Sequence, residues 1–338
     1  MVILSNALSD RPDEGSLKVA SCLAGRIKAA DPGVTVISYE RHTSLSEVHL
    51  KPNKLLLDPS LIRLLRQRQE PVLYLPFPTR ALPMAARIFV LSLVSPTKVI
   101  AVLSLTRQHG WLSWMLLKSS RAHLVAISRK SYDFYREIVG SHRVTYLKTG
   151  VDTRKFRPVS PERSAALKAR YGLDPEKPVL LHVGHLKEGR NVGKLLDADP
   201  DWQILLVVST LTEQDEALRK TLEQRKTIKI IDRYLPDMEE LYQLADVYFF
   251  PVTAENNCID VPLSCLEAAA CGVPVVTTAY GEMGELAGKP GFFFVDEKME
   301  DLNERLRQAL TCGREGIRGS VLPYDWENGA KTLREKLR

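Results

Sequence analysis

The chain has 338 residues, of which 44% are hydrophobic and 26% are charged. This length favours two domains, and the composition is typical of a globular protein without repeats or low-complexity tracts. The net charge of +6 is uneven: residues 1–150 hold 21 Lys and Arg against 10 Asp and Glu, or +11, and the remaining 26 against 31 give −5. The basic half indicates a phosphate-bearing substrate, a membrane surface or a nucleic acid as partner, or plain solvated surface charge.

The cysteines and the apolar runs bear on the compartment. Five cysteines without a C-x-x-C pair predict free thiols in a reducing cytosol. The opening "MVILSN" is too short for the apolar region of a secretory signal. The run "ALPMAARIFVLSLVSP" contains Arg87 and two prolines, so it is too short and too broken to span a bilayer alone. We expect a cytoplasmic protein.

Strand and helix alternate along the whole chain. Strands are predicted at residues 2–5, 33–39, 71–77, 98–106, 122–128, 143–150, 178–184, 202–209, 228–231, 247–252, 273–278 and 291–295. Helical spacing is found at 16–30, 82–94, 129–139, 237–245, 262–270 and 325–338. The alternation predicts α/β architecture with two doubly wound domains joined near Gly150, and a ligand site in the cleft between them.

One short helix combines several signals for a nucleotide site. Pro262 suits a first helical turn and Gly272 suits the left-handed position beyond the last turn, so the helix is predicted at 262–271. Its first N–H groups, those of Leu263 and Ser264, offer an anion site. Glu267 lies one turn further and can accept two hydrogen bonds from a vicinal diol. A phosphate and a ribose fit this pattern, and the alternative is a helix with one solvated Glu.

Five segments resemble glycosyltransferase family 4, a retaining family of nucleotide-sugar enzymes. "LEAAACGVPVVTT" (266–278) is similar to its donor-site signature, and "LLHVGHLKEGRNV" (180–192) to its first donor-domain strand and phosphate loop. "TGVDTRKFRP" (149–158) resembles the interdomain linker, "LADVYFFP" (244–251) the strand before the signature, and "YDWENGAKTL" (324–333) the C-terminal helix. The resemblance covers the C-terminal two-thirds specifically and the rest mainly in fold pattern.

The resemblance implies two Rossmann-like domains that face across a cleft, an arrangement known as GT-B. Residues 1–150 would form the acceptor-side domain and residues 151–322 the donor domain. Residues 323–338 would form a helix that packs back on the first domain. Enzymes of this kind generally need no metal, because cations and helix N–H groups neutralise the diphosphate.

The phosphate loop departs from the family at one position. The family places an Arg and a Lys on the donor diphosphate in a G-R-L…K-G loop. This chain reads Gly184-His185-Leu186 followed by Arg190, so Arg190 takes the Lys position and can clamp phosphate, or is a solvated loop cation. His185 replaces the Arg, which makes the charge there weaker and dependent on pH.

The resemblance also assigns the rest of the donor site. Glu267 aligns with the second acid of a paired-Glu motif and would hold the ribose, while the helix start at Pro262, Leu263 and Ser264 would hold phosphate. The base would rest near Arg233 and Tyr234. The first acid, which normally contacts the donor sugar, falls on Ile259. Asp260 next to it and Glu255 upstream are the candidate substitutes, of which we favour Asp260; its alternative role is a helix N-cap.

In the first domain the resemblance implies three site residues. His109 follows a strand where the family often has a His facing the donor sugar, although it also fits a plain loop His. Gly15 and Ser16 align with a usually Gly-rich loop that touches acceptor and phosphate. Together with Arg190 and Asp260, His109 completes the residues implied for catalysis.

Two surface features remain. "WLSWMLLK" (111–118) is amphipathic and aromatic; it fits a membrane interface, but a core stripe is the favoured interpretation. Arg63, Arg66 and Arg68 are predicted to be exposed, and they would suit docking near a lipid-linked acceptor.

We therefore expect a retaining glycosyltransferase with a nucleotide-sugar co-substrate, no cofactor and no nucleic-acid partner, since no groove-reading motif is present. A lipid-linked or phosphate-bearing acceptor, and contact with the inner face of the plasma membrane through the basic domain, are further expectations. No metal site is expected, because Asp199 and Asp201 lie in a loop and His182 and His185 lack a third ligand. The alternatives are a degenerate member that binds nucleotide or glycan without transfer, and a sugar-nucleotide epimerase.

Overall fold

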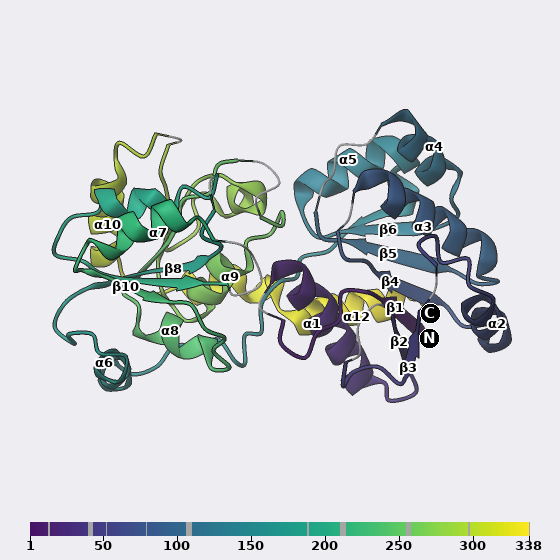
Figure 1. The fold of residues 1–338 in the computed structure, drawn as a ribbon, viewed down its shortest axis with the longest axis horizontal. Coiled ribbons are helices and arrows are strands. Elements are labelled where there is room, and N and C mark those ends of the chain that lie inside the picture. Colours follow the sequence, from purple (N-terminus) through teal and green to yellow (C-terminus); the bar gives the residue numbers. More distant parts are fainter. Residues whose placement is uncertain are drawn as a thin grey trace. The chain divides into compact units, whose positions relative to one another are not determined.

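The computed structural model describes residues 1–12, 14–39, 43–51, 53–78, 80–105, 110–187, 189–209, 214–254, 258–296 and 298–337. The chain forms two compact units (Figure 1). Unit 1 comprises Met1–Thr149, Ile259–Val261 and Trp326–Arg338, and unit 2 comprises Gly150–Cys258 and Pro262–Asp325. The three residues Ile259–Val261 therefore belong to unit 1, although their neighbours in sequence belong to unit 2.

Unit 1 is built on a parallel sheet with the strand order β3-β2-β1-β4-β5-β6-β7. Its strands are β1 (Val2–Ser5), β2 (Thr35–Tyr39), β3 (Val48–Leu50), β4 (Val72–Leu75), β5 (Val99–Leu103), β6 (His123–Ala126) and β7 (Val144–Tyr146). The order reverses between β1 and β4, which is the switch point of a doubly wound sheet. Strands buried on both faces read as continuous apolar runs, and those of β1, β4 and β5 do so.

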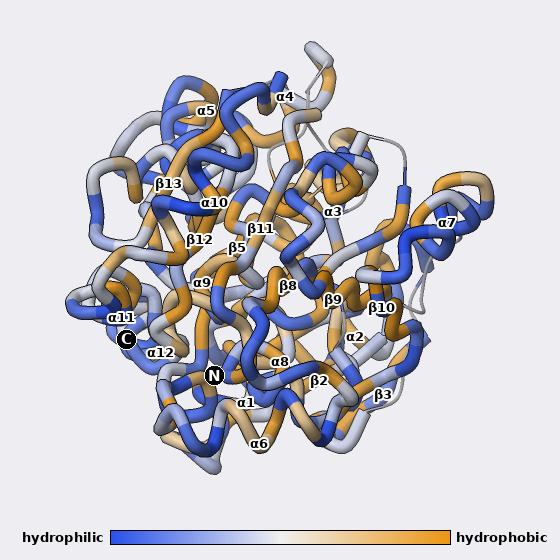
Figure 2. Tube along the Cα trace, turned by 90° about the vertical axis from the view of Figure 1, so that its left-hand side faces the viewer, coloured by the Kyte–Doolittle hydropathy of each residue, from blue (hydrophilic) through white to orange (hydrophobic). Residues whose placement is uncertain are grey.

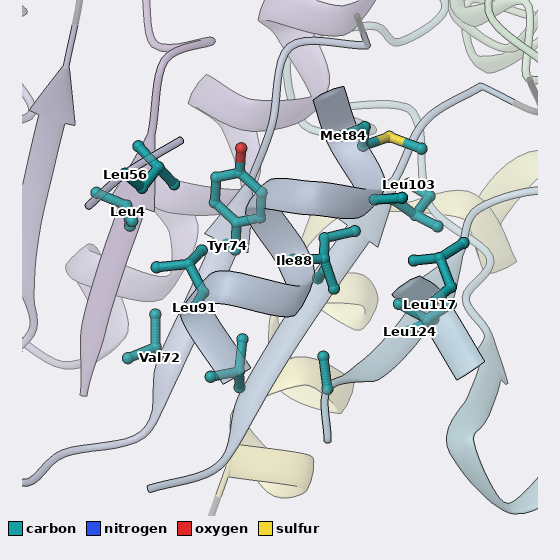
Figure 3. Packing of buried hydrophobic residues seen from close by; sticks show 14 of the residues in the cluster. Leu4, Leu56, Val72, Tyr74, Met84, Ile88, Leu91, Leu103, Leu117 and Leu124 are labelled. Atoms are coloured by element: carbon teal, nitrogen blue, oxygen red, sulfur yellow. The ribbon is translucent and has the colours of Figure 1, made fainter. Parts of the chain in front are cut away.

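Helices cover both faces of this sheet. They are α1 (Gly15–Ala30), α2 (Pro59–Arg68), α3 (Ala81–Val94), α4 (Trp111–Ser119), α5 (Arg129–Val139), the short η1 (Ser141–Arg143) and α12 (Trp326–Leu337). The N-terminus of α2 is capped by Asp58, whose carboxylate accepts from the N–H groups of Ser60 and Leu61. Figure 3 shows Met84, Ile88 and Leu91 of α3 turned toward the strands in the core that α2, α3, α4 and α5 share.

The last helix, α12, packs on α1 within unit 1. A Cβ on Gly329 would lie 2.5 Å from the Oγ1 atom of Thr149 and 3.4 Å from Leu23 of α1. Only a glycine therefore permits this close approach, which is why a helix breaker stands in the middle of an otherwise good helix.

Unit 2 repeats the plan with the strand order β10-β9-β8-β11-β12-β13, all parallel. Its strands are β8 (Val179–Gly184), β9 (Gln203–Val208), β10 (Ile228–Ile231), β11 (Val247–Phe250), β12 (Val275–Thr277) and β13 (Phe292–Phe294). The switch point lies between β8 and β11. The prediction of two doubly wound α/β domains is confirmed.

The helices of unit 2 lie on both sheet faces, with α7 and α10 on one and α8 on the other (Figure 1). They are α6 (Pro161–Arg170), η2 (Val192–Asp197), α7 (Glu216–Glu223), α8 (Met238–Leu244), α9 (Leu263–Ala270), η3 (Gly281–Leu286), α10 (Leu302–Thr311), α11 (Ile317–Val321) and η4 (Leu322–Tyr324). Strand segments such as β8 and β11 are orange in the hydropathy trace, whereas surface helices such as α7 contain blue turns (Figure 2). Within the described ranges, no helix has the length and apolarity that crossing a bilayer requires.

Candidate functional site

The candidate site of unit 2 lies at the carboxyl ends of β8 and β11. These strands flank the switch point, where parallel sheets of this type bind ligands. The loop that follows β8 contains Gly189 and Asn191, both with positive φ. The Asn191 side-chain amide donates to the carbonyl of Pro251 at 3.0 Å and to the Thr253 hydroxyl at 2.8 Å. These two bonds tie the loop after β8 to the loop after β11.

Arg190 lies in this tied loop and is only 8% exposed. Its backbone N–H donates to the carbonyl of Lys187. Its guanidinium forms neither an ion pair nor a hydrogen bond with any residue that the structure describes. Its nitrogens are not among the fully buried side-chain atoms that lack a partner, so they reach solvent and are accessible to an anionic ligand. The predicted phosphate cation is therefore mostly enclosed by protein, and its guanidinium can accept an anion as partner.

Residue 184 is a glycine, so no side chain lies between the end of β8 and the guanidinium of Arg190. A Cβ on Gly184 would lie 3.7 Å from Nη1 of Arg190 and 3.0 Å from Nε2 of His182. His182 is fully buried, and its Nδ1 bonds the Phe249 carbonyl at 2.8 Å, which makes Nδ1 the protonated nitrogen. Its Nε2 is a buried acceptor without a partner among the described residues. His182 was not predicted as part of the site.

The two histidines of this strand end carry no charge at neutral pH. Burial, followed by the charges of Arg190 and Lys187, lowers the pKa of His185 to about 4. Burial is also the main cause that lowers the pKa of His182 to about 4, and Arg190 adds to it. The expected pH-dependence of charge at His185 therefore falls far below physiological pH, and Arg190 and Lys187 are the cations of this loop.

The helix α9 begins one residue later than predicted, with Pro262 as its N-cap, and Gly272 beyond its end has φ +76° as predicted. Proline has no polar side chain that could cap the first N–H groups, which leaves the start of α9 suited to an anion. Ser264 in this first turn is half-buried, and its hydroxyl is a hydrogen-bond partner of Tyr248.

Glu267 is buried, so the interpretation as a solvated surface Glu is wrong. The Tyr242 hydroxyl of α8 donates to its Oε2 at 2.8 Å. Burial, and then the neighbouring Glu267 carboxylate, raise the pKa of Tyr242 well above its usual value. Tyr242 holds the carboxylate in place from the neighbouring helix, a partner that sequence spacing could not reveal. The role of Glu267 toward a ribose stays a prediction.

Arg233 and Tyr234 follow β10, the edge strand of the sheet, and both are exposed. They share the carboxyl edge with Gly184, but two strands separate them from the switch point. Among the described residues, no group of three His, Cys, Asp or Glu side chains is arranged to hold a metal ion.

Asp260 lies in unit 1 and not in the predicted donor domain of residues 151–322. Its Oδ2 accepts hydrogen bonds from the hydroxyls of Ser128 at 3.0 Å and Ser131 at 2.6 Å, at the N-terminus of α5. Its backbone N–H lies 3.4 Å from the carbonyl of Ser104, just after β5. The side chains of Asp260, Ser128 and Ser131 are all buried. Asp260 therefore acts on the start of α5 rather than as a cap of its own helix α9.

Ile259, in the place of the family's first acid, packs against the start of α1. A Cβ on Gly15 would lie 2.9 Å from its Cδ1, and Ser16 beside it is buried. The segment Ile259–Val261 thus contacts three loops at the carboxyl edge of the unit 1 sheet, those after β1, β5 and β6. The predicted residues His109 and Glu255 lie outside the described residues.

Comparison with known sequences relates part of the chain to glycosyltransferases. Residues 177–312, all but three of them in unit 2, match the model of a family described as Glycosyl transferases group 1. A Corynebacterium glutamicum protein described as GDP-mannose-dependent monoacylated alpha-(1-6)-phosphatidylinositol monomannoside mannosyltransferase is 26% identical over 232 residues, 62% of this chain and 60% of that protein. A D-inositol 3-phosphate glycosyltransferase of Rhodococcus jostii is 25% identical over 221 residues, 58% of this chain and 47% of that protein. The chain spans about half the length of these curated relatives.

Solved structures resemble the whole chain. Anabaena HepE in complex with UDP has a TM-score of 0.77 at 17% identity and covers 99% of this chain and 98% of that chain. WaaG, described as a glycosyltransferase involved in lipopolysaccharide biosynthesis, has a TM-score of 0.67 at 16% identity over 100% and 99% of the chains. At these identities the likeness shows the fold, and it confirms the predicted GT-B type. The resemblance to glycosyltransferases is thus borne out for residues 177–312, and the assignment to family 4 stays a prediction.

Proposed function

We propose that this protein is a retaining glycosyltransferase that moves a sugar from a nucleotide-diphosphate donor to an acceptor hydroxyl. The observation that carries the proposal is Arg190, which is 8% exposed, has no anionic partner among the described residues and lies at the switch point of a parallel sheet. A diphosphate supplies the missing negative charge. HepE, a structural neighbour, is described in complex with UDP and with UDP-glucose, which is in keeping with such a ligand.

In this proposal the bond between the sugar C1 and the diphosphate oxygen breaks while the acceptor oxygen bonds to C1 from the same face. The acceptor proton passes to a phosphate oxygen of the leaving nucleoside diphosphate. Arg190 and the first N–H groups of α9 stabilise the charge that develops on the leaving group. Glu267 holds the ribose, and the residues near Arg233 and Tyr234 support the base. No metal is required for these steps.

Unit 1 would bind the acceptor, with Gly15 and Ser16 near it and His109 facing the sugar. Two curated relatives are described as acting on a phosphatidylinositol mannoside and on D-inositol 3-phosphate. We therefore propose a lipid-linked or phosphate-bearing acceptor, as in glycolipid or polysaccharide synthesis at the inner face of the plasma membrane. Asp260 is proposed to replace the first acid.

The test is a thermal-shift titration with UDP, GDP and ADP. A ligand that binds only the folded state stabilises it by about 2.7 kcal/mol at a hundredfold excess over Kd. One nucleotide should shift the wild-type midpoint, and Arg190→Met should lose most of that shift, because the cation that would pair with the diphosphate is removed. The exposed Lys226→Met is the matched control. A full shift in Arg190→Met would refute the role of Arg190.

A second candidate is a member that binds nucleotide sugar without transferring it. The buried Ile259 in the place of the first acid, and the engagement of Asp260 by two serines, favour this candidate. A thermal shift without sugar transfer or donor hydrolysis, across lipid-linked and phosphate-bearing acceptors, would support it. Conversion of the donor sugar in the absence of any acceptor would instead indicate an epimerase.

A further inference from the structure

The helix α4 exposes its aromatic residues. Trp111 is 77% exposed, Met115 is 48% exposed and Trp114 is 38% exposed, whereas Ser113 and Leu117 face the core. The favoured interpretation of this stripe as core is therefore wrong for these three side chains. Trp114 packs edge-on against Phe134 of α5, with ring centroids 6.2 Å apart. Such large apolar side chains are costly to leave in water.

The neighbouring helix α3 also presents an apolar outer side. Its inner side carries Met84, Ile88 and Leu91 (Figure 3). On the opposite side, Leu82 is 43% exposed and Leu93 is 55% exposed, and Phe89 between them is half-buried. Residues 82, 86, 89 and 93 recur at helical spacing, so they form one stripe along the helix.

The two helices pack against each other within unit 1, as Figure 1 also shows. We call their outer side the α3–α4 face, defined by the exposed residues Leu82, Leu93, Trp111, Trp114 and Met115. Large exposed hydrophobic side chains elsewhere in the described ranges are scattered over loops and over helices of unit 2. Single exposed apolar residues are normal, but a cluster on two adjacent helices marks an interaction surface.

The charge around the α3–α4 face identifies its partner. Residues 71–132 contain eight Lys and Arg and no Asp or Glu. Lys118 at the end of α4, Arg121 after it and Lys130 at the start of α5 are exposed. The nearby helix α2 adds Arg63 and Arg66, whose predicted exposure is confirmed. The nearby acid Asp133 of α5 is paired with Arg129 and Arg136. Exposed tryptophans beside an excess of cations match the interface of a membrane with anionic lipids.

We propose that the α3–α4 face is a docking surface for an anionic phospholipid bilayer, with Trp111, Trp114 and Met115 inserted at the headgroup level. Lys118, Arg121 and Lys130 would bind lipid phosphates at its rim. The protein rests on the membrane through this face. The inference does not depend on the donor site, because none of these residues belongs to it.

The tryptophans report insertion directly. The chain has four, and Trp202 and Trp326 are buried in the protein, so Trp111 and Trp114 are the two that lipid can reach. Vesicles of phosphatidylcholine with 30% phosphatidylglycerol should shift the emission to shorter wavelength, and bromine atoms on the acyl chains should quench it. Trp111→Phe with Trp114→Phe should remain bound in sedimentation but lose the quenching. Absence of quenching in the wild type would overturn the proposal.

Two pairs of substitutions test the chemistry of the face. Trp111→Ser with Met115→Ser, and separately Lys118→Glu with Arg121→Glu, should each weaken vesicle binding by roughly tenfold or more. The matched controls are the exposed residues of unit 2: Leu310→Ser for the apolar pair, and Lys220→Glu with Lys226→Glu for the charged pair. The controls should bind like the wild type.

Three outcomes contradict the proposal. Equal binding to vesicles of phosphatidylcholine alone would exclude the role of anionic lipid. Unchanged binding in the apolar pair would exclude the face itself. A dimer that forms without lipid and dissociates in Trp111→Ser with Met115→Ser would assign the face to self-association. Nucleotide-induced thermal shifts measured on the same variants should stay at the wild-type value, which separates a failure of docking from a failure of the donor site.

Discussion

The Ser131 hydroxyl donates a hydrogen bond of 2.6 Å to the carboxylate of Asp260, a residue 129 positions later in the chain. Ser128 donates to the same oxygen, and all three side chains are buried. The start of α5 therefore depends on a residue that sequence comparison would assign to the donor domain.

Asp260→Ala should destabilise the protein by about 2–3 kcal/mol, because it leaves two buried hydroxyls without their acceptor. Asp260→Asn keeps one oxygen and should cost less. Urea denaturation followed by circular dichroism measures both, with the exposed Asp201→Ala as control. A wild-type midpoint for Asp260→Ala would mean that the serines find other acceptors at no cost.

Stability should fall on acidification because of His182. Its pKa is lowered to about 4 in the folded state, so the unfolded chain, with a pKa near 6.5, binds the proton first. The full stability is present above pH 6.5 and is lost as the pH falls toward 4, by roughly 3 kcal/mol for a shift of about 2.5 units. His182→Gln should make the pH profile of the unfolding free energy less steep between these values. Part of the slope should remain, because the pKa values of His123 and His185 are also lowered to about 4. An unchanged profile would show that His182 is not kept neutral by burial.

Gly184→Ala should destabilise unit 2 by about 1–3 kcal/mol, because the new Cβ would lie 3.0 Å from the buried Nε2 of His182. The effect should be smaller in a His182→Ala background, where that atom is absent. A double-mutant cycle of unfolding free energies measures the coupling between the two positions. Strict additivity of the two substitutions would contradict the close contact.

Replacement by alanine should change the thermal stability in opposite directions at two helical glycines. Helix propensity alone favours alanine by about 1 kcal/mol. At Gly329 of α12 the Cβ would lie 2.5 Å from the Thr149 hydroxyl oxygen, so Gly329→Ala should destabilise despite that gain. At Gly319 of α11 nothing lies within 4 Å, so Gly319→Ala should be neutral or stabilising. Thermal midpoints of the two variants provide the comparison, and equal signs would show that crowding at Gly329 is relieved at no cost.

Local patterns in the sequence determined most of the fold. Mostly apolar runs predicted twelve of the thirteen strands in the described residues, since a strand buried on both faces needs such a run, and Gly272 predicted the end of α9 from its left-handed backbone. The strand missed was β3, a three-residue edge strand that is only half-buried and so has no such run. The amphipathic spacing of α4 was visible, but spacing alone does not say which side of a helix meets the core.

Of the candidate site, too, one part was predictable from the sequence and another part was not. The loop after β8 and the start of α9 were placed from residue types and a resemblance, because phosphate chemistry requires cations, glycines and free N–H groups in one short segment. Only the tertiary structure showed that Arg190 is buried, that His182 lies beneath Gly184, that Tyr242 holds Glu267 and that Asp260 joins Ser128 and Ser131. The contacts of Glu267 and Asp260 join residues far apart in the chain. They arise from packing, and the energy of a buried charge or hydrogen bond depends on neighbours that linear spacing does not encode.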